Sequence, residues 1–449
     1  MGQRSIAFSV LIAATSLPGS LAAQDTIQPI EQGIRIGVTY QPGVRPQMLV
    51  LGGERSHMLD SARAILTRDL DFSDEFEMIS LPEGDSMALW IDRSNLAPGQ
   101  APFVNYSLYG VLGADFVVDV APVDSSLRIT LYDVVGSGPR RQLNLAGGDP
   151  TERNFRLSIH QAADELVRAV TGRLGVAGTQ ILFVSRGKIY RADFDGHGVE
   201  LLSTPDSSAM SPVWSPDGRK VLYMEFANGL GPLFELNLET KERRVIPVTA
   251  STLNFAPTYH PDGETIAFSR NTNQGTSIYT YNLAADCCLQ RLTVGGLFDN
   301  LSPTYSPDGR RLAHVSTRIG FPQIYVMESD GTGQELFAPF EYGVSGSSNG
   351  PEWSPDGLYL TFHRDVSRTP QVFIMEVATR VVKQLSSTAR NYDPSWAPDS
   401  RHLAFVSTRT GSQQVWIIDS ETGRVRQLTR LGEARLPAWS PRLPERTNQ

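Results

Sequence analysis

The sequence predicts an all-β six-bladed β-propeller preceded by a smaller N-terminal α/β domain. Three observations support this: a motif that recurs six times, strand-like runs after each copy, and two helix-like segments before the first copy. The motif is clearest as Ser211-Pro-Val-Trp-Ser-Pro-Asp-Gly218, and its copies open with Pro212, Pro257, Pro303, Pro351, Pro394 and Pro437. Successive prolines are 45, 46, 48, 43 and 43 residues apart, and a period of about 40–50 residues is typical of propeller blades.

Each copy of the motif predicts two strands joined by a tight turn. The opening proline cannot donate to a ladder and therefore suits a strand start, and the Trp or Tyr two residues later is a large apolar anchor between blades. In the Pro-Asp-Gly turn, Pro presets φ, Asp bonds the local backbone and Gly accepts a positive φ. Three more strand-like runs follow each inner strand, as at Leu403–Val406, Gln414–Ile418 and Val425–Thr429, and four short strands make a blade.

The two ends of the repeat region complement each other. Residues 181–203 supply three strands without a first one, whereas Leu436–Ser440 supplies a first strand without the other three. We therefore expect five complete blades and a sixth that both ends share, over residues 179–443. Such a strand exchange removes the exposed edges of an open array.

The α/β domain is expected over residues 33–173. Glu54–Leu70 has apolar residues on one face at helical spacing. Asp149 suits a helix cap with Pro150 in the first position, and Gly172 suits the end of that second helix. The remaining elements expected are a first strand at 33–38, a short strand at 76–79, a helical turn at 106–109, and meander strands at 116–120, 127–132 and 141–145.

The beginning of the chain resembles a cleaved secretory signal peptide over residues 1–23. Arg4 precedes an apolar stretch, Ile6–Ala14, that is too short to span a bilayer, and small residues end it at Ala23. Residues 24–32 would then form the N-terminal arm of an exported protein. No later apolar run approaches 18 residues, so we expect a protein that is not embedded in a membrane.

Charge argues against two classes of partner. The chain has 40 Lys and Arg against 48 Asp and Glu, a net charge of −8. A nucleic-acid partner would favour a basic face, and an anionic membrane surface would favour basic clusters. We therefore expect no nucleic-acid partner.

The two cysteines, Cys287 and Cys288, are adjacent. Two thiols or a local turn disulfide between outer strands is favoured over a redox or metal site, because a metal would need further Cys or His ligands nearby.

Other polar residues also favour a chain without metal or cofactor. The aspartate that recurs in each turn has a role in the turn itself, so its repetition does not indicate a calcium site. For Asp193 and Asp195 the favoured interpretation is also a turn, and an ion site is the second interpretation. Four histidines fall at different positions of different repeats and are not expected to converge: His260, His314, His363 and His402.

One segment matches a catalytic pattern. Gly346-Ser-Ser-Asn-Gly350 fits the nucleophile elbow G-x-S-x-G, which requires a strand, a sharp turn and then a helix. Here the anchor Pro351 predicts a following strand, so we expect a protein that is not an enzyme.

A binding surface is better supported. The segments between the last strand of one blade and the first strand of the next should gather at one mouth of the channel. Asparagines occur in these segments, although their amides would also suit a turn. Apolar residues that look exposed occur beside them, and exposed apolar residues favour a protein contact. The predicted partner-binding residues are Met210, Asn254, Phe255, Asn300, Leu301, Asn349, Asn391 and Tyr392.

The chain resembles the TolB family of periplasmic proteins in its domain order and in three segments: Leu112–Val118, Ala192–Gly196 and Pro437–Leu443. The resemblance implies a periplasmic, non-catalytic scaffold of the Tol–Pal system. It also implies that the propeller binds the peptidoglycan-associated lipoprotein, through the mouth residues above, and that the mature N-terminus binds a TolA-like inner-membrane protein. The implied role is outer-membrane integrity and envelope constriction at cell division.

Two alternatives share the repeat pattern. The first alternative is a regulatory propeller detached from a peptidase, because peptidases of the prolyl-oligopeptidase type have propellers with similar units. A propeller that binds a small ligand or glycan in its channel is the other.

Overall fold

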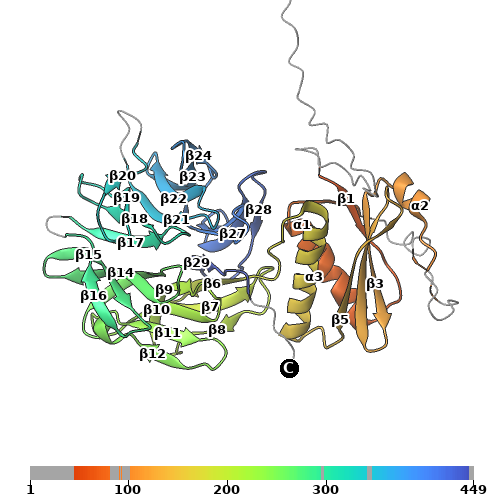
Figure 1. The fold of residues 1–449 in the computed structure, drawn as a ribbon, viewed down its shortest axis with the longest axis horizontal. Coiled ribbons are helices and arrows are strands. Elements are labelled where there is room, and N and C mark those ends of the chain that lie inside the picture. Colours follow the sequence, from red (N-terminus) through yellow and green to blue (C-terminus); the bar gives the residue numbers. More distant parts are fainter. Residues whose placement is uncertain are drawn as a thin grey trace, which may run out of the picture. The chain divides into compact units, whose positions relative to one another are not determined.

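The computed structural model describes residues 45–80, 90, 91, 93, 102–294, 298–340 and 346–443. Within these residues the strands form one five-stranded sheet and six four-stranded sheets (Figure 1). The predicted signal peptide, the arm at 24–32 and the strand at 33–38 lie outside the described residues. None of the described helices is long and apolar enough to cross a membrane.

The five-stranded sheet belongs to the α/β domain and has the order β2-β1-β3-β4-β5. β1 runs parallel to β2 and β3, and β3, β4 and β5 form an antiparallel meander. Both the short strand and the meander were predicted from the sequence. The bounds are β1 Gln47–Val50, β2 Glu77–Met78, β3 Phe116–Val123, β4 Ser126–Asp133 and β5 Gly138–Ala146.

Helices cover both faces of this sheet. α1 (His57–Phe72) and α3 (Arg153–Thr171) pack together on one face, and the apolar face predicted for α1 is buried there. The short α2 (Tyr106–Val111) packs with Tyr132 and Val117 on the other face.

The predicted start of α3 was wrong by three residues. The helix begins at Arg153, and its N-cap Glu152 makes no side-chain cap hydrogen bond. The Asp149 carboxylate instead accepts hydrogen bonds from Thr151 N at 2.8 Å and Thr151 Oγ1 at 2.7 Å, which closes a separate turn before the helix. The predicted end is confirmed, because Gly172 is left-handed with φ 78°.

The propeller contains five complete blades and one shared blade. In the complete blades, four consecutive strands pair in sequence order. The first blade consists of β9 Ser208–Trp214, β10 Lys220–Phe226, β11 Leu233–Asn237 and β12 Arg243–Val245. The second and third blades consist of β13 Leu253–Tyr259, β14 Thr265–Thr272, β15 Gly275–Asn282 and β16 Cys287–Arg291, and of β17 Asn300–Tyr305, β18 Arg311–Ser316, β19 Gln323–Glu328 and β20 Glu335–Leu336. The fourth and fifth blades consist of β21 Ser348–Trp353, β22 Tyr359–Val366, β23 Thr369–Glu376 and β24 Val382–Gln384, and of β25 Asn391–Trp396, β26 His402–Ser407, β27 Gln414–Asp419 and β28 Val425–Gln427.

The sixth blade confirms the predicted strand exchange. Its order is β29-β6-β7-β8, so the last strand pairs with the first strand of the propeller. The antiparallel register places Ala438 opposite Leu182 and Trp439 opposite Ile181. The bounds are β29 Arg435–Trp439, β6 Gln180–Ser185, β7 Lys188–Asp193 and β8 Glu200–Leu201.

The turn of the repeated motif forms as predicted in the five complete blades, where the residue after each motif aspartate is left-handed and the aspartate accepts a backbone hydrogen bond. In the first blade Asp217 Oδ1 accepts hydrogen bonds from Ser215 Oγ at 2.6 Å and from Arg219 N at 3.0 Å, and Gly218 has a φ of 69°. The carboxylate therefore serves the turn. The Trp214 indole donates from Nε1 to Ala438 O at 3.0 Å, which joins the first blade to the shared blade.

Deleting residues 436–449 should abolish the cooperative thermal unfolding of the propeller. The deletion removes nearly all of β29, so β6 becomes an unpaired inner strand with an exposed edge. Calorimetry or circular dichroism would record the loss of a single sharp transition, together with aggregation. An unchanged melting curve would contradict closure by strand exchange.

Candidate functional site

The inner strand of every blade carries a bulge at the same place. The register against the second strand shifts in all six blades, and the residue just before the anchor proline is left-handed. These residues are Ser211 (φ 53°), Ala256 (47°), Ser302 (51°), Gly350 (59°), Asp393 (50°) and Leu436 (49°). A left-handed non-glycine residue costs roughly 1 kcal/mol, and bulges re-aim side chains next to functional rims.

The bulge determines which side chains face inward. The residue three places before the anchor proline is fully buried in all six blades, whereas the residue two places before it is half-buried. The buried set is Ala209, Asn254, Asn300, Ser348, Asn391 and Ala434, and the half-buried set is Met210, Phe255, Leu301, Asn349, Tyr392 and Arg435.

The eight predicted partner-binding residues are split between these two sets. They were placed in loops, but all of them lie in inner strands. Asn254, Asn300 and Asn391 are fully buried, and the expectation of exposed Phe255, Leu301 and Tyr392 was wrong because these side chains are half-buried. Partner binding by the half-buried set stays a prediction.

Two of the buried asparagines, Asn254 and Asn391, hold the ends of adjacent blades together. Asn254 Nδ2 donates to Gly231 O of the first blade and to Thr249 O, both at 3.0 Å. Asn391 Nδ2 donates to Gln371 Oε1 of the fourth blade at 2.8 Å. Their amides therefore fix the relative position of adjacent blades at this end.

The half-buried residues form contacts across blade boundaries. Met210 and Phe255 pack against the apolar core shared by the first two blades. Tyr392 of the fifth blade meets His363 of the fourth blade edge to face, with ring centroids 6.3 Å apart.

Charged groups also meet at the bulge of the fifth blade. Burial raises the pKa of the Asp393 carboxyl to about 6, against the opposing effect of Arg435 from the shared blade. Burial lowers the pKa of His363 to about 4, so its ring is neutral near pH 7 and Nδ1 accepts from Asp393 N at 3.3 Å.

Exposed apolar side chains surround these inner strands at the same end of the blades. In the third blade Asn300, the first residue of β17, pairs with Ser316, so the hairpin 317–322 lies at the end where the inner strand begins. Ile319 and Phe321 in this hairpin are 50% and 44% exposed. Equivalent hairpins and blade-to-blade loops contribute Phe226, Leu230, Val294, Val366 and Leu431.

We call these seven residues, together with the half-buried set, the mouth face. The seven exposed residues were not predicted from the sequence, because they lie outside the segments just before each anchor proline. The available signal was an apolar residue within a hairpin, as in Thr317-Arg-Ile-Gly-Phe-Pro322.

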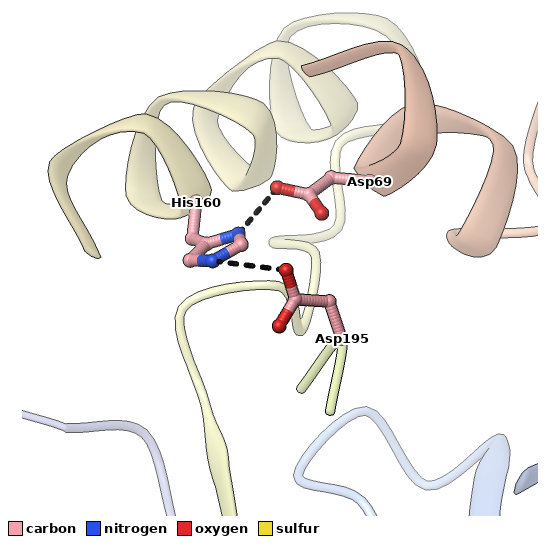
Figure 2. A group of neighbouring side chains, drawn as sticks. All are labelled: Asp69, His160 and Asp195. Carbon is pink, nitrogen blue, oxygen red and sulfur yellow. Dashed lines mark hydrogen bonds and ion pairs between the residues drawn. The ribbon is translucent and has the colours of Figure 1, made fainter. Parts of the chain in front are cut away.

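A second cluster of functional groups joins the two helices to the shared blade. Figure 2 shows His160 of α3 between Asp69 of α1 and Asp195 of the β7–β8 hairpin. His160 Nδ1 lies 2.5 Å from Asp69 Oδ2, and His160 Nε2 lies 3.7 Å from Asp195 Oδ2. All three side chains are buried, and Arg68 and Arg156 also pair with Asp195 Oδ2.

Electrostatics agree with an ionic role for this cluster. Burial favours a neutral imidazole, but Asp69, Asp195 and Asp193 outweigh it and raise the pKa of His160. Burial also opposes ionisation of Asp195, yet His160 and Arg68 outweigh it and lower the pKa of this carboxyl. Both shifts favour the charged form of the group concerned, the imidazolium of His160 and the carboxylate of Asp195.

The segment after α1 is held by the fifth blade in a similar way. Arg401 donates to Asp419 through Nε at 3.0 Å and through Nη2 at 2.6 Å, and its Nη1 donates to Glu75 Oε1 at 2.7 Å. His402 Nδ1 lies 2.6 Å from Asp399 Oδ2, and its Nε2 lies 3.4 Å from Asp74 Oδ2.

Neither group has the arrangement of a metal site. Asp69, His160 and Asp195, and likewise Asp74, His402 and Asp419, bring three possible ligands close together. In the first group, however, the two carboxylates lie at opposite nitrogens of one imidazole, and guanidinium groups already occupy Asp195. In the second, Arg401 already binds Asp419 through two nitrogens. These cations replace a metal in the charge balance.

The sequence showed little of these clusters. Asp195 was predicted to be a turn residue in the first place. Its ion-pair partners, Arg156 and Arg68, lie on helices 39 and 127 residues away in the sequence. The only signal was that Asp69 and His160 interrupt the apolar faces of their helices. The prediction that His260, His314, His363 and His402 would not converge is consistent with these groups, each of which contains one histidine.

The repeat region matches a known family model. Residues 167–441 match the model described as the TolB beta propeller domain, which is more than half of the chain. The chain belongs to the TolB family.

Curated relatives and a solved structure agree with this membership. The Protein TolB homolog of Chlorobium luteolum is 28% identical over 239 residues, which are 51% of this chain and 53% of the relative. The Tol-Pal system protein TolB of Alcanivorax borkumensis is 29% identical over 223 residues, 47% of this chain and 48% of the relative. The chain spans about half the length of the curated relatives it matches.

The structure of TolB from Acinetobacter baumannii has the same fold. Its TM-score is 0.73 at 24% identity, with 89% of this chain and 98% of that chain covered. The predicted order of a small α/β domain and a six-bladed propeller is thereby confirmed.

The nucleophile-elbow pattern lacks the required context in this structure. Ser348 is the first residue of strand β21 and is fully buried. Its hydroxyl accepts a hydrogen bond from Arg364 Nε at 3.0 Å. The serine therefore serves the same packing position as the buried asparagines of the neighbouring blades.

The free energy of unfolding should fall as the pH rises from 6.5 to 9. Burial opposes the charge on His402, but Asp399 and Asp74 outweigh it and raise its pKa from 6.5 to about 9. A raised folded-state pKa contributes stability that is complete below pH 6.5 and lost through about pH 9, on the order of 3 kcal/mol. Urea titrations across this range would measure the slope.

His402→Gln should flatten that pH dependence, because the titrating group is absent. His57→Gln is the matched control, since His57 is exposed at the start of α1. Equal slopes for wild type and His402→Gln would contradict the ionic role of His402.

Proposed function

We propose that this chain is the TolB-type component of a Tol–Pal system and binds the peptidoglycan-associated lipoprotein through its mouth face. The observation that carries the proposal is the mouth face itself, on a propeller of a family whose relatives are named Tol-Pal system protein TolB. The proposed location is the periplasm, after cleavage of residues 1–23. The proposed role is a non-catalytic scaffold for outer-membrane integrity and envelope constriction at division.

The composition of the mouth face supports a protein partner. Large apolar side chains such as Phe226, Ile319 and Phe321 are 44–50% exposed in hairpins that surround the inner strands. Aromatic anchors within a polar rim are typical of protein interfaces. Burying these side chains on a partner would stabilise the complex in proportion to the apolar area removed from water.

The rigidity of this face supports the same conclusion. The buried amides of Asn254 and Asn391 tie neighbouring blades together directly beneath the half-buried ring. A face that is already ordered loses little conformational entropy when a partner binds. The mouth face therefore suits recognition of one folded protein.

Phe321→Ser should weaken lipoprotein binding at least about tenfold, because an aromatic anchor that becomes buried on a partner contributes about 2 kcal/mol or more. Phe321 is exposed in the free protein, so the substitution should leave the melting temperature nearly unchanged. Isothermal titration calorimetry with the purified soluble domain of the lipoprotein would measure the affinity.

Leu358→Ser is the matched control. Leu358 is 59% exposed and lies in the turn between β21 and β22, at the opposite end of the blade. Wild-type affinity is expected for Leu358→Ser. Wild-type affinity for Phe321→Ser, Phe255→Ala and Tyr392→Ala together would place the partner elsewhere.

Removal of residues 24–32 should abolish binding of a TolA-like inner-membrane protein and leave lipoprotein binding intact or stronger. In this proposal residues 24–32 themselves make the contact and become ordered when they bind, so their removal eliminates the contact entirely. Surface plasmon resonance with the periplasmic domain of the inner-membrane protein would compare intact and shortened chains. Equal binding by both would rule out the arm as the contact.

A further inference from the structure

Cys287 and Cys288 form a disulfide on the outermost strand of the second blade. They are the two cysteines of the chain, and the bond joins adjacent residues at the start of β16. Of the two alternatives left by the sequence, free thiols and a local disulfide, the structure shows the disulfide.

The bond coincides with an irregularity that related hairpins lack. In the fourth and fifth blades the outer pairing is regular, with Met375 opposite Val382 and Ile418 opposite Val425. In the second blade the register between β15 and β16 shifts, so that Thr280 lies opposite Gln290 while Asn282 lies opposite Cys287. Cys288 is the bulged residue, and it is left-handed with φ 70°.

The hairpin does not depend on this bond for closure. Ala285 N donates to Asn282 Oδ1 at 2.7 Å, and Tyr281 Oη donates to Asp286 Oδ1 at 2.6 Å. The corresponding turn of the first blade closes with an equivalent hydrogen bond, from Glu239 N to Asn237 Oδ1 at 2.9 Å, and has no cysteine. A bond between adjacent residues also restricts the unfolded chain very little. A stabilising role therefore does not account for it.

The pair is accessible to other thiols. Cys288, Leu289 and Gln290 are exposed, and β16 is the edge strand of its sheet. Thiol–disulfide exchange requires access of a thiolate to one sulfur, and an exposed edge gives that access.

We infer that Cys287–Cys288 is a thiol–disulfide exchange site that accepts electrons from a dithiol and whose redox state controls the bulge of β16. A thiolate of the dithiol attacks one sulfur, the cysteine S–S bond breaks and a mixed disulfide forms. The second thiol of the dithiol then displaces the remaining cysteine. The dithiol is oxidised to a disulfide, and its two electrons and two protons pass to Cys287 and Cys288, which become thiols.

Reduction should change the outer strand alone. The disulfide holds Cys288 in its left-handed conformation, which is energetically unfavourable for a residue other than glycine. Without that restraint the pairing of β16 with β15 loosens, whereas the core of the blade, which includes Ile278 and Tyr281, stays packed. The site would therefore change an edge of the propeller without unfolding it.

The test uses the full mature chain equilibrated with mixtures of reduced and oxidised dithiothreitol. Alkylation followed by mass spectrometry counts the thiols, and hydrogen–deuterium exchange compares β16 with β24 and β28 as internal references. We expect reversible appearance of both thiols together in the folded protein. Exchange in β16 should become at least about tenfold faster, with no change in β24, β28 or the melting temperature.

The double variant Cys287→Ser/Cys288→Ser separates the bond from the reducing agent. It should show the fast β16 exchange under all redox conditions. Three results would each overturn the inference: reduction that requires unfolding, β16 exchange that is the same in both states, or a melting temperature that falls sharply on reduction.

Discussion

The propeller depends on the pairing of β29 with β6. Ser440 N donates to Gln180 O at 2.8 Å, and Gln180 N donates to Ser440 Oγ at 3.0 Å, across 260 residues of sequence. Bringing such distant segments together has an entropic cost that only the completed ring offsets. Every blade then has two neighbours, and the exposed edges of an open array disappear.

Ring closure also positions both functional regions. The inner strands meet around one channel, so the bulge before each anchor proline is repeated around the same mouth. The shared blade that closes the ring also carries Asp195, which pairs with Arg68 of α1 and Arg156 of α3. The mouth face and the ionic contacts with the α/β domain therefore belong to one closed scaffold.

Local patterns allowed much of the fold to be predicted. The Pro-Asp-Gly turn and its aromatic anchor lie within a few residues of each other, so their spacing revealed the blades and the shared sixth blade. The position of Asn254 could not be predicted in the same way. Its burial depends on the left-handed bulge at Ala256, and nothing in the residue type of an alanine indicates that conformation.

Long-range charge pairs were equally inaccessible to sequence reasoning. Asp69 and His160 are 91 residues apart, and only the packing of α1 against α3 brings them together. The start of α3 was misplaced for a local reason, since the Asp149 carboxylate has two competing roles and bonds Thr151 instead of capping the helix. Tertiary contacts and competition between equivalent local hydrogen bonds account for these differences.

Native-state hydrogen exchange at increasing denaturant tests the closure most directly. If the β29–β6 pairing holds the ring, the amides of β29 and Ser440 should exchange only through global unfolding. Their free energies of opening should then equal those of β25 and β26 in the complete fifth blade. Exchange of the β29 amides through a separate opening of much lower free energy, while β25 and β26 stay protected, would contradict this account.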